Sequence, residues 1–398
     1  MSCESDFIVP TDYQTLYDTL QYLLNTAPFD PPKTYKKMSY GLHLITASSG
    51  IEFWDNATSN DVYSDAPLHY NLETHKLMID MIKDVDVDFI NIRTRYPDND
   101  YVSGSEEALH GAIQYAQSKG LDLYLMYIPL GLEHLHISQG NTTEFMTKYK
   151  DFIDEFVTVY KPKYFQIYDY GQIFASIGIS IDPLIPEMYN YLKAASPTTL
   201  WIEAQGTNTT NQVVKFKYYC DSIYNDVMGI PLHDLYYTTH IQNLNEMVEY
   251  AKSKNRILVC PDCWLTDAHF DDLGELFLNT GWREPLDNTY INKVINIVQK
   301  LEFESINMFY GNHFISYNPG FFYPVTTSYG YTSEDWVNCL KQGYRTSLVE
   351  SYSDAILSTK TQVSETVSGR AGLVVAGLAV VVVGILVSLL VSARKRGV

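Results

Sequence analysis

The chain has 398 residues, and its 28 lysines and arginines against 47 aspartates and glutamates give a formal net charge of −19 at pH 7. Such an acidic surface repels phosphate groups, so we expect no nucleic-acid partner. Only five cysteines are present, which is too few for a disulfide scaffold in a chain of this length.

Residues 1–37 are predicted to form an N-terminal extension with one helix, which the pattern places over residues 11–28. The opening segment MSCESDFIVP contains no apolar run of the kind that a signal peptide carries. A folded domain is expected from residue 38 to residue 346.

Between residues 38 and 315, short apolar segments rich in β-branched and aromatic residues alternate with segments of helical periodicity. Such alternation is typical of parallel βα units. The eight expected strands are SYGLHLI from Ser39, DFINIRTRY from Asp88, LDLYLMYIPL from Leu121, KYFQIYDYG from Lys163, TTLWIEAQG from Thr198, DVMGIPLHD from Asp226, RILVCPDCW from Arg256 and SINMFYGNHF from Ser305.

The segments between the expected strands carry the start, stop and face signals of amphipathic helices. Ser105 caps one that ends at Gly120, and similar apolar stripes recur after later strands. Eight strands over about 280 residues match an α/β fold of the (β/α)8 TIM barrel type. The alternative is an open doubly wound sheet, which is less favoured because no glycine-rich turn follows the first strand.

The C-terminal part contains a candidate membrane anchor. Residues 347–370 are rich in Ser, Thr, Glu and Gln and are predicted to be a short stalk. Ala371 to Ser392 is an uncharged run rich in Val, Leu and Gly, and roughly 20 apolar residues suffice to span a bilayer. A single transmembrane helix is therefore expected over residues 371–392, with a buried core helix as the alternative.

The basic tail, residues 393–398, indicates the orientation of the anchor. Arg394, Lys395 and Arg396 directly follow the apolar run, and such clusters favour the cytoplasmic side of a membrane. Residues 1–369 are then expected outside, and the alternative is a tail-anchored protein that faces the cytosol. Without Arg370 and the three basic residues of the tail, 24 basic residues remain against 47 acids, a net charge of −23.

Three Asn-x-Thr glycosylation patterns occur, at Asn56, Asn141 and Asn208. They are usable only if the domain faces outward. They therefore depend on the orientation and do not establish it.

Cys260-Pro261-Asp262-Cys263 has the CxxC spacing of redox and zinc sites. The redox interpretation requires the pair at a helix N-terminus of a thioredoxin-like unit, whereas this pair follows an apolar strand. No second CxxC completes a zinc site. A local disulfide or two free thiols is the favoured interpretation.

The chemistry of a (β/α)8 barrel lies at the C-terminal ends of its strands. Three carboxylates are expected there and are predicted to be catalytic: Asp169 after the fourth strand, Glu203 on the fifth and Asp262 on the seventh. Paired carboxylates suggest glycoside hydrolysis, in which one protonates the leaving oxygen and the other attacks the sugar or activates water. The residues expected to bind the substrate are His43, Arg93, Tyr127, His233, Trp264 and Asn312.

Strand alternation gives this prediction a geometric form, because every second side chain points to the same side. Phe165 and Asp169 share one side of the fourth strand, and Trp201 and Glu203 share one side of the fifth. We expect both sides to face inward, which makes Asp169 and Glu203 neighbours at the mouth. Some pair of the three carboxylates should then be about 5 to 5.5 Å apart, as a retaining mechanism requires, or about 6.5 to 9.5 Å apart, as an inverting one requires.

Residues 38–318 resemble the clan-A glycoside hydrolases in strand pattern and in short motifs. Arg93 within FINIRTRY resembles the arginine that follows the second strand of that family, and the fourth to sixth strands resemble the family in YFQIYDYGQ, PEMYNYLKAASPTTLWIEAQG and YNDVMGIPLHD. The resemblance implies a barrel that acts on carbohydrate, with Asp262 at the end of the strand that carries the nucleophile. We expect neither a metal nor a cofactor.

The fourth-strand acid motif departs from the family, because Tyr170 follows Asp169 where the family has a glutamate. Asp262 is also shorter than the family's glutamate by one methylene, or about 1.5 Å of reach. A displacement of about 1 Å can cost on the order of 100-fold in rate. The sequence therefore leaves open a hydrolase with rearranged carboxylates and a barrel that only binds sugar.

The leading hypothesis is a membrane-anchored, glycoside-hydrolase-like barrel that acts on or binds carbohydrate at a cell or virion surface. The alternative is a non-catalytic surface, virion structural or adhesion protein whose barrel mouth binds a glycan or a protein partner. A third is a metal-dependent hydrolase using His43, His233, Asp262 and His313. It is disfavoured because SYGLHLI contains one histidine and not the His-x-His pair usual in such barrels.

Overall fold

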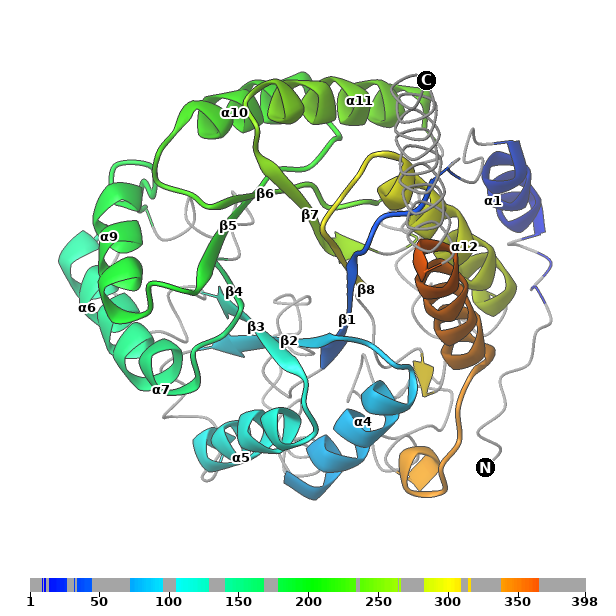
Figure 1. Ribbon diagram of the computed structural model, residues 1–398, viewed down its shortest axis with the longest axis horizontal. Coiled ribbons are helices and arrows are strands. Elements are labelled where there is room, and N and C mark those ends of the chain that lie inside the picture. Colours follow the sequence, from blue (N-terminus) through cyan, green and yellow to red (C-terminus); the bar gives the residue numbers. More distant parts are fainter. Residues whose placement is uncertain are drawn as a thin grey trace, which may run out of the picture.

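The computed structural model contains a closed barrel of eight strands whose spatial order equals their chain order (Figure 1). The structure describes residues 14–26, 34–44, 72–95, 105–128, 140–167, 178–233, 237–263, 283–308 and 338–364, with short pieces at 9, 11, 32, 265 and 314–315. The strands are β1 (Ser39–Leu44), β2 (Phe89–Arg95), β3 (Asp122–Ile128), β4 (Tyr164–Ile167), β5 (Leu200–Ala204), β6 (Val227–Gly229), β7 (Ile257–Cys263) and β8 (Ser305–Met308).

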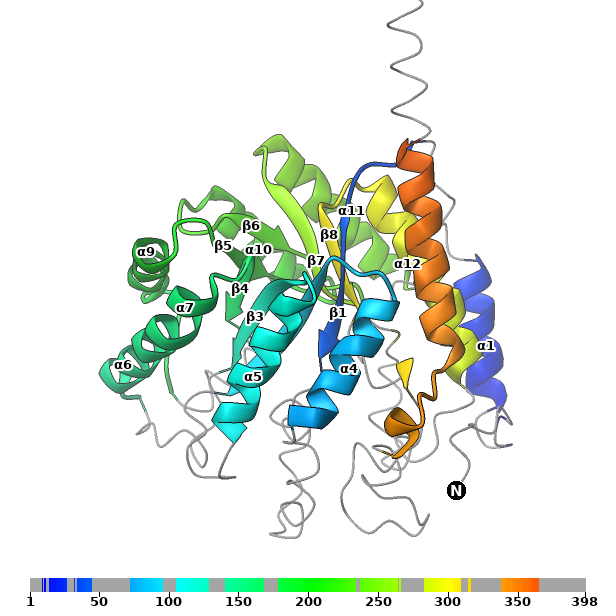
Figure 2. The same cartoon turned by 60° about the horizontal axis from the view of Figure 1, so that its bottom comes forward.

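Helices form a layer around the strands in both ribbon views (Figures 1 and 2). Gly120, two residues after the end of α5, has a φ of 75°. This is the left-handed conformation that ends helices and that glycine adopts without strain. The helices are α1 (Gln14–Thr26), α4 (Leu72–Asp84), α5 (Ser105–Ser118), α6 (Thr142–Phe152), the π-helix η4 (Ile153–Val157), α7 (Thr158–Tyr160), α9 (Ile185–Ala195), α10 (Thr210–Asp221), α11 (Thr238–Ser253) and α12 (Glu284–Lys300).

All eight neighbouring strand pairs are parallel, including the closing pair β1 and β8. The strands are buried on both faces, which explains why they appear in the sequence as short apolar runs. The predicted TIM barrel is confirmed, and the open sheet is excluded because no edge remains between β1 and β8.

Three aromatic rings fill the barrel near the N-terminal ends of the strands. The centroid of Phe89 lies 6.3 Å from that of Tyr124 and 5.7 Å from that of Tyr164, and the two tyrosine rings are 6.0 Å apart. Gly41 faces this group, and a Cβ there would overlap the Phe89 ring. Phe89, Tyr124 and Tyr164, named here the aromatic plug, therefore close this end of the barrel.

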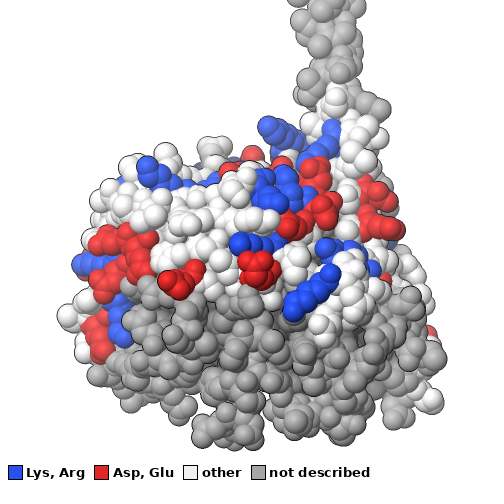
Figure 3. Space-filling view, turned by 90° about the horizontal axis from the view of Figure 1, so that it is seen from below, with Lys and Arg blue, Asp and Glu red and all other residues white. Residues whose placement is uncertain are grey.

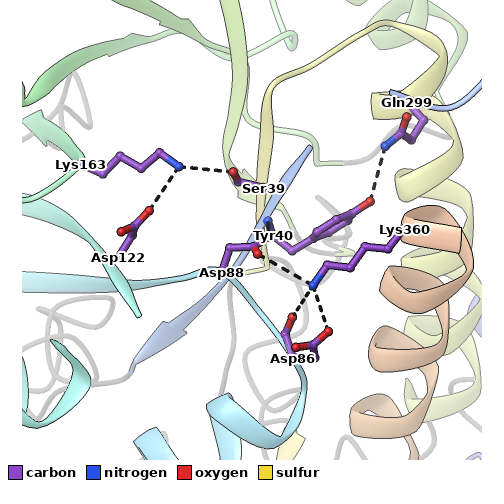
Figure 4. Close-up of polar contacts among 8 residues, drawn as sticks. All are labelled: Ser39, Tyr40, Asp86, Asp88, Asp122, Lys163, Gln299 and Lys360. Carbon is purple, nitrogen blue, oxygen red and sulfur yellow. Dashed lines mark hydrogen bonds and ion pairs between the residues drawn. The ribbon is translucent and has the colours of Figure 1, made fainter. Parts of the chain in front are cut away.

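Lys163 covers the plug at the N-terminal end of the barrel. Its Nζ lies 5.4 Å from the centre of the Tyr164 ring and donates to the hydroxyl of Ser39 at 3.3 Å (Figure 4). It is also 3.3 Å from the carboxylate of Asp122. One side chain thus links the first residues of β1 and β3 to the residue before β4.

The helix layer repeats one polar arrangement four times, in which a tyrosine hydroxyl and a lysine ammonium share an aspartate and the lysine lies over the tyrosine ring. In one copy Tyr250 donates to Asp221 at 2.8 Å, while Lys254 lies 2.6 Å from the same carboxylate and 5.2 Å from the ring centre. Lys254, followed by Tyr250, lowers the pKa of Asp221. The four groups are Asp80/Tyr115/Lys119, Asp182/Tyr219/Lys215, Asp221/Tyr250/Lys254 and Asp226/Tyr189/Lys193.

These groups join helices or loops that are adjacent in the layer, for example α4 to α5 and α10 to α11. In each, the tyrosine and lysine are four residues apart, on one helix or just past its end, the spacing that brings side chains to the same face. Figure 3 shows the outcome on the described surface, where acidic and basic side chains are interspersed.

Residues 347–364 form a further helix that packs on the barrel next to α12 (Figures 1 and 2). Glu284 of α12 accepts a hydrogen bond from the backbone N–H of Ser347 at 2.8 Å, in the first turn of this helix. Tyr352 is fully buried and donates to the carbonyl of Gly41 in β1 at 3.0 Å. Lys360 lies 2.9 Å from Asp86, just before β2 (Figure 4).

The stalk predicted over residues 347–370 is therefore wrong for residues 347–364, which belong to the barrel. The buried residues Leu348, Tyr352, Ala355, Ile356 and Thr359 follow a helical period. The Ser- and Thr-rich composition concealed that stripe.

Within the described part of the chain, no helix has both the length and the apolar character needed to cross a bilayer. The expected span, residues 371–392, and the basic tail lie outside it.

If the helix over 347–364 completes the fold, Ile356→Ala should lower the free energy of unfolding by about 2–5 kcal/mol, because Ile356 is fully buried. Leu357→Ala is the matched control, since Leu357 is 60% exposed, and it should change stability by no more than about 0.5 kcal/mol. Urea unfolding of a chain ending at residue 370 measures both. Equal losses in the two variants would contradict the docking.

Candidate active site

Above the aromatic plug, toward the C-terminal ends of the strands, the barrel interior becomes polar. Four polar side chains stand two positions after Gly41, Phe89, Tyr164 and Ser305, so alternation gives each of them the same side of its strand as that residue. All are at most 6% exposed. They are His43 on β1, Asn91 on β2, Gln166 on β4 and Asn307 on β8, named here the polar layer.

Two members of the polar layer are fixed by hydrogen bonds inside the barrel. Gln166 accepts from the hydroxyl of Tyr124 in the plug. Asn307 donates from Nδ2 to the carbonyl of Pro261 at 3.0 Å, and so connects β8 to the end of β7. One bond therefore links the polar layer to the plug, and the other links it to the end of β7.

Asp262 lies on a bulge in β7. Cys260 pairs with Ile306 but Cys263 with Met308, so the register shifts between them. Pro261 has no N–H to donate to a ladder, which is why it is tolerated at such an irregularity. The carbonyl of Asp262 accepts from the N–H of Leu232 at 2.9 Å and from the thiol of Cys260 at 3.4 Å.

Cys263 and Asp262 are both buried at the end of β7. Cys263 faces the helix layer, since its thiol contacts the hydroxyl of Tyr290 on α12 at 3.9 Å. Asp262 is 3% exposed, and it lies within the bulge that interrupts the regular alternation of this strand. Asn307 of β8 bonds the carbonyl of the adjacent Pro261.

Tyr290 ties the ends of β6 and β7 together from outside. Its hydroxyl donates to the carbonyl of Leu232 at 2.6 Å, and Leu232 in turn forms a parallel bridge with Cys263. His233 follows Leu232 directly and is half-buried. The positions of both His233 and Asp262 therefore depend on Tyr290.

Cys260 and Cys263 of the CxxC pair are free thiols and do not form the local disulfide that was the other favoured interpretation. Both cysteines are buried, and burial raises the pKa of Cys263 well above its ordinary value. A reactive cysteine needs an accessible site that stabilises the thiolate, so redox chemistry does not fit. Among the described residues no group of three or more His, Cys, Asp or Glu side chains could hold a metal ion.

The prediction that Phe165 of β4 and Trp201 of β5 face the barrel interior is wrong. Phe165 packs on Tyr149 of α6, with ring centroids 6.2 Å apart, and Trp201 packs on Tyr189 of α9 at the same separation. These sides face the helices, and Glu203 shares the side of Trp201. Glu203 is half-buried at the end of β5, where Gln205 donates to it at 3.4 Å.

Tyr127 also belongs to the interface between strand and helix layer. Its ring is fully buried, 4.9 Å from that of Phe152 and 6.2 Å from that of Tyr149 on α6. It therefore presents no face to the mouth, and the expectation that it binds substrate is wrong. The sequence shows which residues share a side with Tyr127 along β3, but it does not show that this side faces the helices.

The remaining predicted residues divide by position. His43 lies in the polar layer, and Arg93 belongs to β2, where it pairs in register with Met126 of β3. The side chain of Arg93 lies outside the described part of the structure, as do Asp169, Trp264 and Asn312 entirely. The polar residues Asn91, Gln166 and Asn307 were not predicted, because they lie inside strands and not at strand ends.

No protein-family model and no curated protein matches the chain. Among solved structures, it is similar to a xyloglucan-specific endo-β-1,4-glucanase of glycoside hydrolase family 5 from a metagenomic library, at 11% identity and a TM-score of 0.49, with 85% of this chain and 99% of that one covered. A family 5 mannosidase from Rhizomucor miehei is 12% identical, with a TM-score of 0.47 and coverages of 82% and 95%.

A family 39 glycoside hydrolase from the gut symbiont Bacteroides cellulosilyticus WH2 is 8% identical, with a TM-score of 0.46 and 69% of this chain covered. This chain spans 56% of that one. All three of these structures are glycoside hydrolases, the class of protein that the sequence resembles.

Tyr290→Phe tests the connection between α12 and the bulge. Loss of the bond to Leu232 leaves a buried carbonyl without its donor, which should raise the exchange rate of the Leu232 amide by about tenfold or more. Hydrogen exchange followed by NMR measures that amide directly.

The matched control is Tyr149→Phe, which removes an equally buried hydroxyl that donates to Met188 in the helix layer at 2.8 Å. It should leave the Leu232 amide protected. Equal exchange of Leu232 in the two variants would show that Tyr290 does not hold the ends of β6 and β7.

Proposed function

We propose that the chain is a membrane-anchored barrel that binds carbohydrate at its mouth and acts on it through Asp262. The observation that carries the proposal is a buried carboxylate on a bulge at the C-terminal end of β7. Active sites of (β/α)8 enzymes lie at this end of the strands. Strand bulges are over-represented next to active sites.

The chemistry assigned to Asp262 is that of the second carboxylate of a glycosidase. In a water-poor interior its negative charge stabilises the positive charge that develops on the sugar during cleavage, or it attacks the anomeric carbon. Asn307 helps to place it, because its amide bonds the carbonyl of the preceding Pro261. His233, directly after the β6 bridge, is assigned to substrate orientation.

A glycosidase also needs an acid that protonates the leaving oxygen. Asp169 is the candidate for that role, since it follows β4 at the end of the barrel where active sites lie. Glu203 is the second candidate, and it shares the helix-facing side of β5 with Trp201. The position of Glu203 is also the observation that favours the second function, a barrel that binds a glycan or partner without cleaving it.

Asp262→Asn separates the two functions. If Asp262 is catalytic, the amide should reduce cleavage by at least about 100-fold while the variant still binds the sugar, because shape is kept and charge is lost. Glycan binding is measured on an array, and cleavage by release of reducing ends from the sugars retained.

Asp154→Asn is the matched control, an aspartate of η4 that accepts from Tyr191 at 2.9 Å on the exposed outer layer. It should cleave like the unmodified chain. Binding without cleavage by the unmodified chain would establish the non-catalytic function, and undiminished cleavage by Asp262→Asn would remove this residue from the mechanism.

The membrane part of the proposal assigns residues 371–392 as a single span and the barrel to the outer face of a cell or virion. Cys339 is disulfide-bonded, and disulfides persist in oxidising compartments outside the cytosol. Asn141 is exposed directly before α6, and Asn208 is exposed two residues before α10. Both glycosylation patterns are therefore accessible to a modifying enzyme.

Translation of the full chain with membrane vesicles of the secretory pathway tests this orientation. A barrel inside the vesicle should gain glycans that an endoglycosidase removes, and Asn141→Gln with Asn208→Gln should eliminate most of that gain. An unglycosylated barrel that added protease digests in intact vesicles would place it on the cytosolic side.

A further inference from the structure

Asn91 is the most unusual member of the polar layer. It is 1% exposed, and neither its Oδ1 nor its Nδ2 has a hydrogen-bond partner in the part of the chain that the structure describes. By register it lies between His43 of β1 and Tyr124 of β3. Buried side-chain amides in proteins are nearly always bonded, so this one requires an explanation.

The comparison with Gln166 shows that the fold can satisfy an amide at this depth. Gln166 lies on the same inner side of the barrel and accepts the hydroxyl of Tyr124. Asn91, whose register neighbour is the same Tyr124, receives no such bond. A leucine of the same branched shape would avoid the desolvation of an unpaired donor and acceptor. The amide therefore lowers the stability of the free protein, which is expected of a group whose partner is a ligand.

The chemistry of the unused groups defines that ligand. Asn91 offers one acceptor and two donors in one plane. Asn307 adds an acceptor, because its Nδ2 is held by Pro261 while its Oδ1 has no partner in the described structure. An anion only accepts hydrogen bonds and an ammonium group only donates them. A hydroxyl does both, so neighbouring hydroxyl groups match these amides.

We propose that Asn91 is a carbohydrate-binding residue that takes two adjacent hydroxyl groups of the sugar unit deepest in the barrel. This inference rests on the proposed function and makes it more specific. The aromatic plug closes the barrel below Asn91, and a continuous ladder of strands closes its sides. A sugar can reach this amide only from the mouth, so the unit bound is a chain end.

Asn91→Leu tests the proposal by two independent measurements. The variant should unfold at the same temperature as the unmodified chain or higher, because an unpaired amide is removed. It should bind at least tenfold more weakly to the member of an immobilised panel of mono- and disaccharides that the unmodified chain retains. A purely structural role for the amide would instead lower the unfolding temperature.

Gln166→Leu is the matched control. It removes an amide that the fold does use, so it should lower the unfolding temperature. If Asn91→Leu does not fold, sugar binding is measured with Asn91→Ala, which removes the amide without adding volume; its unfolding temperature is not compared, because the cavity it leaves is destabilising by itself.

Three outcomes overturn the inference. If the unmodified chain retains a sugar and Asn91→Leu retains it equally, the proposed function stands and the role of Asn91 falls. If Asn91→Leu is destabilised like Gln166→Leu, the amide is structural. If the unmodified chain retains no sugar of the panel, the carbohydrate function and the role of Asn91 fall together.

Discussion

The volume inside a closed eight-stranded barrel must be filled by side chains from one face of each strand, and the rest of the structure depends on how this is done. Here three rings, Phe89, Tyr124 and Tyr164, fill the lower part, and Gly41 leaves room for them. Because apolar bulk is concentrated at one end, the other end is available for polar groups. The aromatic plug thus determines the level at which the polar layer begins and the direction from which a ligand can enter.

The outer layer solves a different problem, which is how to hold amphipathic helices in place around that barrel. Four aspartates each receive a tyrosine hydroxyl and a lysine from a neighbouring element. A single exposed ion pair contributes little, but here the lysine also lies over the tyrosine ring, and the tyrosine adds a charge-assisted hydrogen bond. The arrangement gives a physical role to some of the 33 tyrosines of the chain.

The fold could be predicted from the sequence because eight apolar runs alternate with helical periods, and closure in chain order follows from their number and direction. The site could be predicted only partly. Period-two alternation tells which residues share a side of β5, but whether Trp201 faces a sugar or α9 depends on packing with Tyr189, which is far away in the sequence. The bulge before Cys263 shifts the register of β7 by a residue that no local pattern reveals, apart from the presence of Pro261. The helix over 347–364 had a readable stripe, and its composition obscured it.

Stability and function are divided along the axis of the barrel. Below, the aromatic plug fills the interior, and Lys163 bonds Ser39 and Asp122 at its edge. Above, a carboxylate and unpaired amides are buried, and each unpaired donor or acceptor costs about 1–3 kcal/mol, a noticeable part of a net stability of about 5–15 kcal/mol. Such a cost is tolerable only because the plug and the helix layer supply a surplus elsewhere. The unpaired amide of Asn91 lies on the side of the plug from which a ligand can enter, which is the reason for assigning it to ligand binding.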